Sequence, residues 1–212
     1  LRDDKEIVLT ALDSLPFWNK VAGVEAILSC ISDRLKADNQ VIRNALSKNW
    51  ISISYASQEI RKDPGFVLQA IYHNAQAYEF AHPDLANDKL FALTAIQTQY
   101  QYGTDYQGGP GVYSYLSETL KKDRDVVLAA ISQDPIGCSN ALLAQALELR
   151  NDKDVVHAAI EKCPSALKYA SPVLLTDKKL VSKAVERDFS TIRFAPIELL
   201  RDKDFMLSLI KR

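Results

Sequence analysis

Histidine and cysteine are the side chains in this sequence best suited to nucleophilic or metal chemistry. The histidines are His73, His82 and His157, and the cysteines are Cys30, Cys138 and Cys163. No two histidines have the i, i+4 spacing of a helical zinc site, and no Cys-x-x-Cys pair occurs. We therefore expect no catalytic residue, no metal site and no cofactor.

Paired carboxylates are the second candidate for chemistry, because two acids held close together can act as general acid and base. Such pairs occur in Asp123-Arg124-Asp125 and again around Lys153, in Asp152-Lys153-Asp154. The same arrangement returns at regular intervals where helices are predicted to begin. Regular recurrence favours helix capping and interaction with the helix dipole over catalysis. We expect no enzyme active site in these residues.

A glycine- and tyrosine-rich insertion near residues 97–112 is the most distinctive candidate for binding. Tyrosine offers a large contact area with few torsions to fix, and glycine permits unusual backbone conformations. The candidate contact residues are Tyr100, Tyr102, Tyr106 and Tyr113. The insertion lacks the lysine-containing pattern of a phosphate-binding loop. Two interpretations stay open: a partner-binding loop, or a mobile excursion in which Tyr113 or Tyr115 belongs to the aromatic column of the repeat.

Phe17 and Trp18 form a second candidate contact, within an insertion near residues 13–24. Adjacent aromatic residues often dominate the energy of protein interfaces. The alternative, favoured by the neighbouring Pro16, is that both side chains fill the core of an irregular unit. A third insertion, near residues 136–144, gives no functional signal.

A sequence repeat recurs along the whole chain, and the insertions interrupt it. Each copy of the repeat begins with an aspartate. The leading aspartates are Asp4, Asp38, Asp63, Asp88, Asp123, Asp152, Asp177 and Asp202. The basic step is 25 residues, as from Asp38 to Asp63, and the insertions lengthen three steps. A fixed period of this size is typical of stacked helical repeats. We number positions in each repeat from its aspartate, which is position zero.

Each repeat is predicted to begin with a helix that the aspartate caps. Positions three, four, seven and eight are apolar and fall on one helical face. Position seven is alanine in every repeat except the last, where it is Leu209, which predicts a close approach of helices. Asn or Asp at positions eleven or twelve predicts a left-handed helix end, followed by a second short helix.

The pattern therefore predicts an all-α fold, an α-solenoid of about seven short helical hairpins. We expect one helical-repeat array over residues 1–212, as a segment of a longer protein. The chain also resembles a catalogued family, and three segments carry the resemblance: residues 55–63, Tyr169-Ala170-Ser171 and the helix at 126–131. The family is the tandem repeats called domain of unknown function 4116, found in large proteins of intracellular and amoeba-associated bacteria, including secreted Legionella-like effectors.

The resemblance carries no catalytic motif and implies a repeat scaffold in a host-interacting bacterial protein acting in the host cytoplasm. Composition agrees with a scaffold, since a net charge of −1 with interspersed signs indicates neither nucleic acid nor an anionic membrane as partner. Unpaired cysteines favour a reducing intracellular compartment, and no apolar stretch predicts a membrane span. We expect a non-enzymatic scaffold that binds a protein partner and no small molecule. The alternative is a spacer arm that positions or regulates a catalytic domain elsewhere in the full-length protein.

Overall fold

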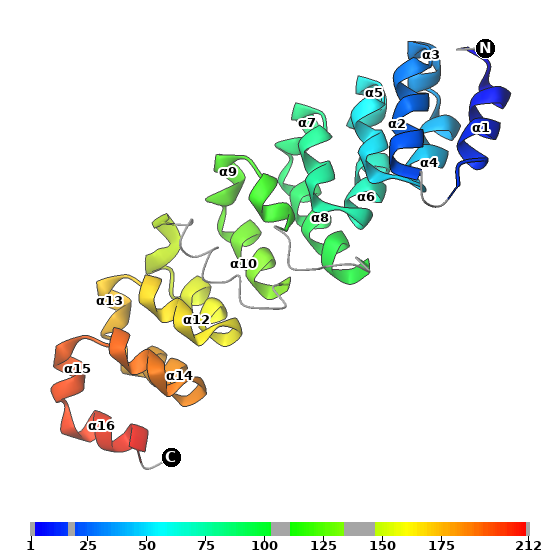
Figure 1. Cartoon of the computed structure of the whole chain (residues 1–212). Coiled ribbons are helices and arrows are strands. Elements are labelled where there is room, and N and C mark those ends of the chain that lie inside the picture. The colour runs from blue at the N-terminus through cyan, green and yellow to red at the C-terminus, as the bar shows by residue number, and fades with distance from the viewer. Residues whose placement is uncertain (1–2, 17–19, 103–110, 134–146, 211–212) are drawn as a thin grey trace. The chain divides into compact units, whose positions relative to one another are not determined.

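The computed structural model describes residues 3–16, 20–102, 111–133 and 147–210 (Figure 1). These residues form helices joined by short links, and no strand occurs among them, so the predicted all-α fold is confirmed for this part. The chain divides into two compact units, residues 1–117 and residues 118–212. The expectation of one continuous array over both units stays a prediction.

Unit 1 contains eight α-helices and three 3₁₀ helices among its described residues. The α-helices are α1 (Lys5–Asp13), α2 (Lys20–Cys30), α3 (Asp33–Lys36), α4 (Asn39–Leu46), α5 (Gln58–Lys62), α6 (Pro64–His73), α7 (Pro83–Ala86) and α8 (Lys89–Tyr102). The 3₁₀ helices are η2 (Trp50–Tyr55), η3 (Ala75–Phe80) and η4 (Val112–Tyr115). Helices α4 and α6 pack together, as do α6 and α8, and the row of η2, η3 and η4 packs in the same order.

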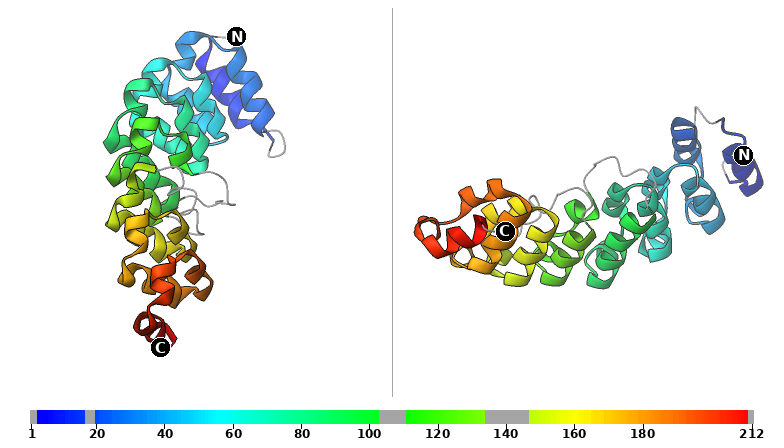
Figure 2. Two further views of the ribbon diagram at one scale, coloured as in Figure 1. Left: turned by 90° about the vertical axis from the view of Figure 1, so that its left-hand side faces the viewer. Right: turned by 90° about the horizontal axis from the view of Figure 1, so that it is seen from below.

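Unit 2 repeats this construction. Its α-helices are α9 (Glu118–Lys121), α10 (Arg124–Gln133), α12 (Lys153–Lys162), α13 (Pro172–Leu175), α14 (Lys178–Arg187), α15 (Ile197–Arg201) and α16 (Lys203–Ile210). Its 3₁₀ helices are η5 (Leu147–Asn151), η6 (Pro164–Tyr169) and η7 (Phe189–Phe194). Helix α12 packs between α10 and α14, and α16 follows on α14 (Figure 2, yellow to red).

The leading aspartates cap the first helix of each repeat, as predicted. Each carboxylate accepts at least one backbone N–H from the first turn of that helix. In α14, for example, Asp177 Oδ1 accepts from the N–H of Lys179 at 2.9 Å and that of Leu180 at 3.3 Å. An aspartate cap of this kind is worth about 1 kcal/mol.

The end of this first helix differs from the prediction. Asn49, Asn74 and Asp188 have extended backbones, with φ of −154°, −158° and −148°, so the predicted left-handed end is wrong. Their side chains instead accept the N–H two residues ahead and cap a 3₁₀ helix, as Asn74 does for Gln76 at 2.8 Å. The preference for Asn and Asp at this place reflects capping of the next helix, not a turn conformation.

The remainder of each repeat is two helical pieces where one was predicted. In the second complete repeat of unit 1, η3 is followed by α7, and in unit 2 η6 is followed by α13. Ser57 and Ser171 begin the second piece, because the hydroxyl of each accepts the N–H three residues ahead. These serines have extended backbones, which break the helix before a new one begins.

The predicted core positions are buried. Positions three, four, seven and eight are 5% exposed or less in every repeat between the first and the last. The position-seven alanines are fully or almost fully buried, namely Ala45, Ala70, Ala95, Ala130, Ala159 and Ala184. A methyl side chain lets the helices of neighbouring repeats approach closely, so a larger residue there would overpack the contact.

Two of the three insertions contain additional helix. The first insertion overlaps the start of α2, and the second begins with the last six residues of α8, so residues 97–102 are helix and not loop. The segment from Gln97 to Tyr102 has no Gly, Pro, Asn or Asp, which explains why the helix continues. The third insertion, near 136–144, lies outside the described residues.

Candidate protein-binding groove

Neighbouring repeats are joined by ion pairs that the sequence pattern did not predict. A basic residue at position one reaches the leading aspartate of the following repeat. These pairs are Lys5–Asp38, Arg124–Asp152, Lys153–Asp177 and Lys178–Asp202. In Asp177 one oxygen caps α14 while the other accepts Lys153 Nζ at 2.7 Å. One carboxylate therefore both begins a helix and holds the preceding repeat.

These contacts lower the pKa of the capping carboxyls. For Asp177 the hydrogen bond from Lys153 is the main cause, and the two backbone N–H groups add to it. For Asp152 partial burial alone would raise the pKa, but the hydrogen bonds from Arg124 and from the helix N–H groups outweigh it and lower the pKa. The charged form of each aspartate is therefore the one that the fold stabilises.

A backbone hydrogen bond also joins repeats. The donor is the N–H of the residue six positions before one leading aspartate. The acceptor is the carbonyl of the residue two positions before the leading aspartate of the preceding repeat. The pairs are Ser57 to Lys36 at 3.0 Å, His82 to Arg61 at 2.9 Å and Ser171 to Arg150 at 2.9 Å. Pro196 holds the equivalent place in the last repeat and has no N–H to donate. The chain at Pro196 thus lacks the bond that these three pairs make.

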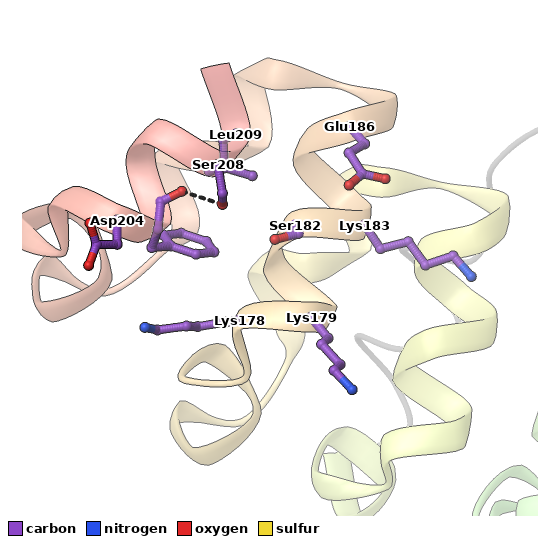
Figure 3. Close-up of a pocket in the computed structure, with 9 residues that line it drawn as sticks. Lys178, Lys179, Ser182, Lys183, Glu186, Asp204, Ser208 and Leu209 are labelled. Atoms are coloured by element: carbon purple, nitrogen blue, oxygen red, sulfur yellow. Dashed lines mark hydrogen bonds between the residues drawn. The ribbon is translucent and has the colours of Figure 1, made fainter. Parts of the chain in front are cut away.

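A groove lies between α14 and α16 in unit 2, with a volume of about 530 Å³ (Figure 3). Cavities of roughly 300–1,000 Å³ are the usual size of ligand clefts. Its lining residues are Lys178, Lys179, Ser182, Lys183, Glu186, Asp204, Phe205, Ser208 and Leu209. The Ser208 hydroxyl donates to the Phe205 carbonyl of its own helix at 2.6 Å. Its hydrogen is therefore already used within α16.

Leu209 distinguishes α16 from the first helices of the other repeats. It occupies position seven, where every other repeat has alanine, and it forms part of the groove wall. A leucine occupies more of the space between two helices than an alanine does. The one departure from the alanine column therefore coincides with the groove.

Two of the lysines around the groove are already held by acidic residues. Lys178 pairs with Asp202, and Lys183 pairs with Glu161 on α12 while its Nζ lies 3.0 Å from His157 Nε2. Lys179, on the same helix, has no ion pair among the described residues. In Figure 3 its side chain and that of Lys183 extend away from α16. The groove therefore combines the apolar residues Phe205 and Leu209 with a rim of mixed charge that also includes Glu186 and Asp204.

The predicted contact residues are not gathered at this groove. Tyr113 is 5% exposed and packs in the core, which agrees with its assignment to the repeat. Tyr100 and Tyr102 belong to α8, but their side chains lie outside the described part, as do Tyr106, Phe17 and Trp18 altogether. A binding role for these residues stays a prediction. The groove itself had a sequence signal, namely the single leucine in the alanine column.

The histidines and cysteines are also dispersed. Cys30 is exposed on α2, and Cys163 lies with its Sγ 3.2 Å from Ser165 Oγ; Cys138 falls outside the described residues. No group of three potential metal ligands occurs in the part of the chain that the structure describes. No helix there is long and apolar enough to span a membrane.

Comparison with known proteins identifies the repeat but no individual relative. No curated protein and no solved structure matches the chain. One family model matches three separate stretches, residues 4–61, 106–142 and 177–212, which together make up more than half of the chain. Each stretch includes an aspartate-capped first helix, at Asp4 and Asp38, at Asp123, and at Asp177 and Asp202. The chain belongs to the family described as Domain of unknown function (DUF4116).

Proposed function

We propose that this chain is a non-enzymatic helical-repeat scaffold that binds a protein partner, and that the groove between α14 and α16 takes part. The groove is the single observation that carries the proposal. It occurs where Leu209 replaces the alanine that brings other helices together. A groove lined by side chains of two neighbouring helices suits a helix or an extended segment of another protein.

The chemistry of the groove favours a protein over a reaction. Phe205 is buried, at 4% exposure, so the half-buried Leu209 offers the apolar contact for a side chain of the partner. Its charged residues are mostly engaged with other parts of the fold, as Lys178 is with Asp202. A catalytic site would require a nucleophile or an acid–base pair within hydrogen-bond reach of a common point. The contacts that Lys183 makes with His157 and Glu161 involve α12, and its side chain extends away from α16 (Figure 3).

The experiment is affinity capture with a groove-filling variant and a matched control. Ser208→Trp places a large ring in the groove, while Thr94→Trp makes the same change at the same repeat position in α8. Both hydroxyls donate to a carbonyl of their own helix, so both variants lose a comparable bond. Captured partners should be lost with Ser208→Trp and kept with Thr94→Trp. Equal recovery with both would remove the groove from the proposal.

The resemblance to repeats of Legionella-like effectors adds a second step: the partner is a host protein and the full-length protein is a secreted bacterial effector. Capture from host-cell lysate and from bacterial lysate separates these sources. A partner that is recovered only from the bacterial lysate would overturn this step without affecting the groove.

A spacer arm is the second candidate function, and the links between repeats favour it. Each carboxylate such as Asp177 is held by both its own helix and the preceding repeat, which stiffens the stack. A spacer needs stiffness but no groove. A partner lost on Ser208→Trp would decide for binding.

A further inference from the structure

The last two residues of η6 and of η7 repeat one pair of residue types, a cation followed by an aromatic residue. The pairs are Lys168-Tyr169 and Arg193-Phe194, 25 residues apart. Because η6 and η7 pack against each other, the two pairs lie on neighbouring repeats of unit 2. Lys168 and Arg193 are exposed, whereas the two rings are half-buried. We call these four residues the η6–η7 surface.

Both cations rest on aromatic rings. Lys168 Nζ lies 4.7 Å from the centroid of the Tyr169 ring, and Arg193 Cζ lies 4.8 Å from that of Phe194. Arg150 approaches the Tyr169 ring as well, at 5.5 Å. Cation–π contacts at these distances orient a charged group without neutralising it.

The charge of the η6–η7 surface is not balanced by acids. Neither Lys168 nor Arg193 forms an ion pair within the part of the chain that the structure describes. Lys153 and Lys178, on the first helices of the same repeats, are instead paired with aspartates. The Asp188 carboxylate, at the start of η7, accepts the N–H of Ser190 and forms an ion pair with neither cation. Both cations can therefore form ion pairs with an anionic group of another molecule.

The aromatic residue recurs at this place in unit 1 without the cation. In unit 1 the equivalent pairs are Ser54-Tyr55, Glu79-Phe80 and Ser114-Tyr115. The aromatic ring is half-buried in each, as it is in unit 2, while the preceding residue is a serine or a glutamate. Because η2 and η3 pack side by side without any cation there, the cations of η6 and η7 are not needed for packing.

We propose that the η6–η7 surface is a docking site for an acidic segment of a partner protein. Two carboxylates of the segment would each accept hydrogen bonds from one cation, and charge-assisted bonds of this kind are the strong ones. The rings beside the cations offer apolar contact to the methylene groups of glutamate side chains. This inference rests on the proposed protein-binding function, but it uses elements separate from the groove.

A nucleic acid is the weaker fit. Binding to a phosphate backbone draws on many cations along a stripe, and its affinity depends on how many phosphates are neutralised. The surface presents few cations in a chain whose net charge is −1. A short acidic segment needs no more than the two sites that the repeat spacing supplies.

The test is the binding of a fluorescein-labelled oligo-glutamate peptide to the full chain, followed by fluorescence anisotropy. The variant Lys168→Ser/Arg193→Ser restores the serine that unit 1 carries and should weaken binding about tenfold. Arg201→Ser/Lys203→Ser removes one arginine and one lysine from exposed places on α15 and α16, so it matches the change in net charge. That control should bind as the native chain does. Equal weakening by both variants, or none by the first, would overturn the proposal.

A gain-of-function arm tests the same logic in the other unit. Ser54→Lys together with Glu79→Arg builds cation–aromatic pairs on η2 and η3, and should add a second site for the peptide. No increase in the bound peptide at saturation would contradict the inference. A single-stranded oligonucleotide that binds more tightly than the peptide, and depends on Lys168 and Arg193, would overturn the choice of partner. Ser208→Trp should leave peptide binding unchanged, which separates this proposal from the groove.

Discussion

Asp177 is expected to stabilise the fold in two separable ways, by capping α14 and by pairing with Lys153. The cap is worth about 1 kcal/mol. The ion pair adds about 0.5 kcal/mol, because the Lys153 side chain is 61% exposed and solvent screens the interaction. Asp177→Ala should therefore cost about 1.5 kcal/mol. Asp177→Asn keeps an oxygen that can cap, so it should cost only about 0.5 kcal/mol.

Urea unfolding followed by far-ultraviolet circular dichroism measures both variants, provided that the slope of the transition stays constant. Combining Asp177→Asn with Lys153→Met completes a double-mutant cycle, and the two changes should be coupled by about 0.5 kcal/mol. Asp4 is the matched control: it caps α1 but has no ion pair among the described residues. Asp4→Asn should be close to neutral. If Asp177→Asn cost as much as Asp177→Ala, or the cycle showed no coupling, the bridging role would be refuted.

Three further predictions concern packing, pH and capping. Ala130→Leu should lower the free energy of unfolding by about 1–3 kcal/mol, because the larger side chain overpacks the contact. The control Ala129→Leu, at a half-buried neighbour, should change it by less than about 0.5 kcal/mol. Urea unfolding measures both. The folded protein lowers the pKa of Asp177, so the stabilisation by its carboxylate is present above about pH 4 and is lost as the pH falls further. Below that pH the urea midpoint of the native chain should drop more steeply than the midpoint of the double variant Asp177→Asn/Lys153→Met. Asn74→Ala should cost about 1 kcal/mol while Asn74→Ser should be nearly neutral in urea unfolding, because serine caps a helix as well as asparagine but does not favour a left-handed helix end.

The periodic part of the fold was predictable because one residue type decides each feature. An aspartate caps a helix through its own neighbours, and an apolar stripe at positions three, four, seven and eight has one way to be buried. The cap occurs at every leading aspartate, and the stripe is buried in every repeat between the first and the last. The buried alanines at position seven, such as Ala159, followed from size alone.

The links between repeats were less accessible to sequence reasoning. Lys153 and Asp177 are 24 residues apart, and nothing in a single repeat indicates that position one reaches the next aspartate. The conformation of Asn74 was misread because asparagine suits both a left-handed helix end and an N-cap. Only the placement of η3 directly after it decides between them.

The candidate binding surfaces were visible in part. Leu209 was noted as the exception in the alanine column, but its consequence depends on how α14 and α16 are spaced. The cations of Lys168 and Arg193 gain meaning only by comparison with the serines and glutamate of unit 1, once all five positions are known to be equivalent in structure. The tyrosines of the second insertion, by contrast, attracted attention through composition, and Tyr113 is core.

Hydrogen exchange of individual amides tests most directly whether each repeat is bonded to its neighbour. The N–H groups of Ser57, His82 and Ser171 lie in links between helices, yet each donates to a carbonyl of the preceding repeat. We predict that these three amides exchange as slowly as those inside the first helices. Exchange at the rate of open links, with protection confined to the helices themselves, would contradict the account of repeats joined one to the next.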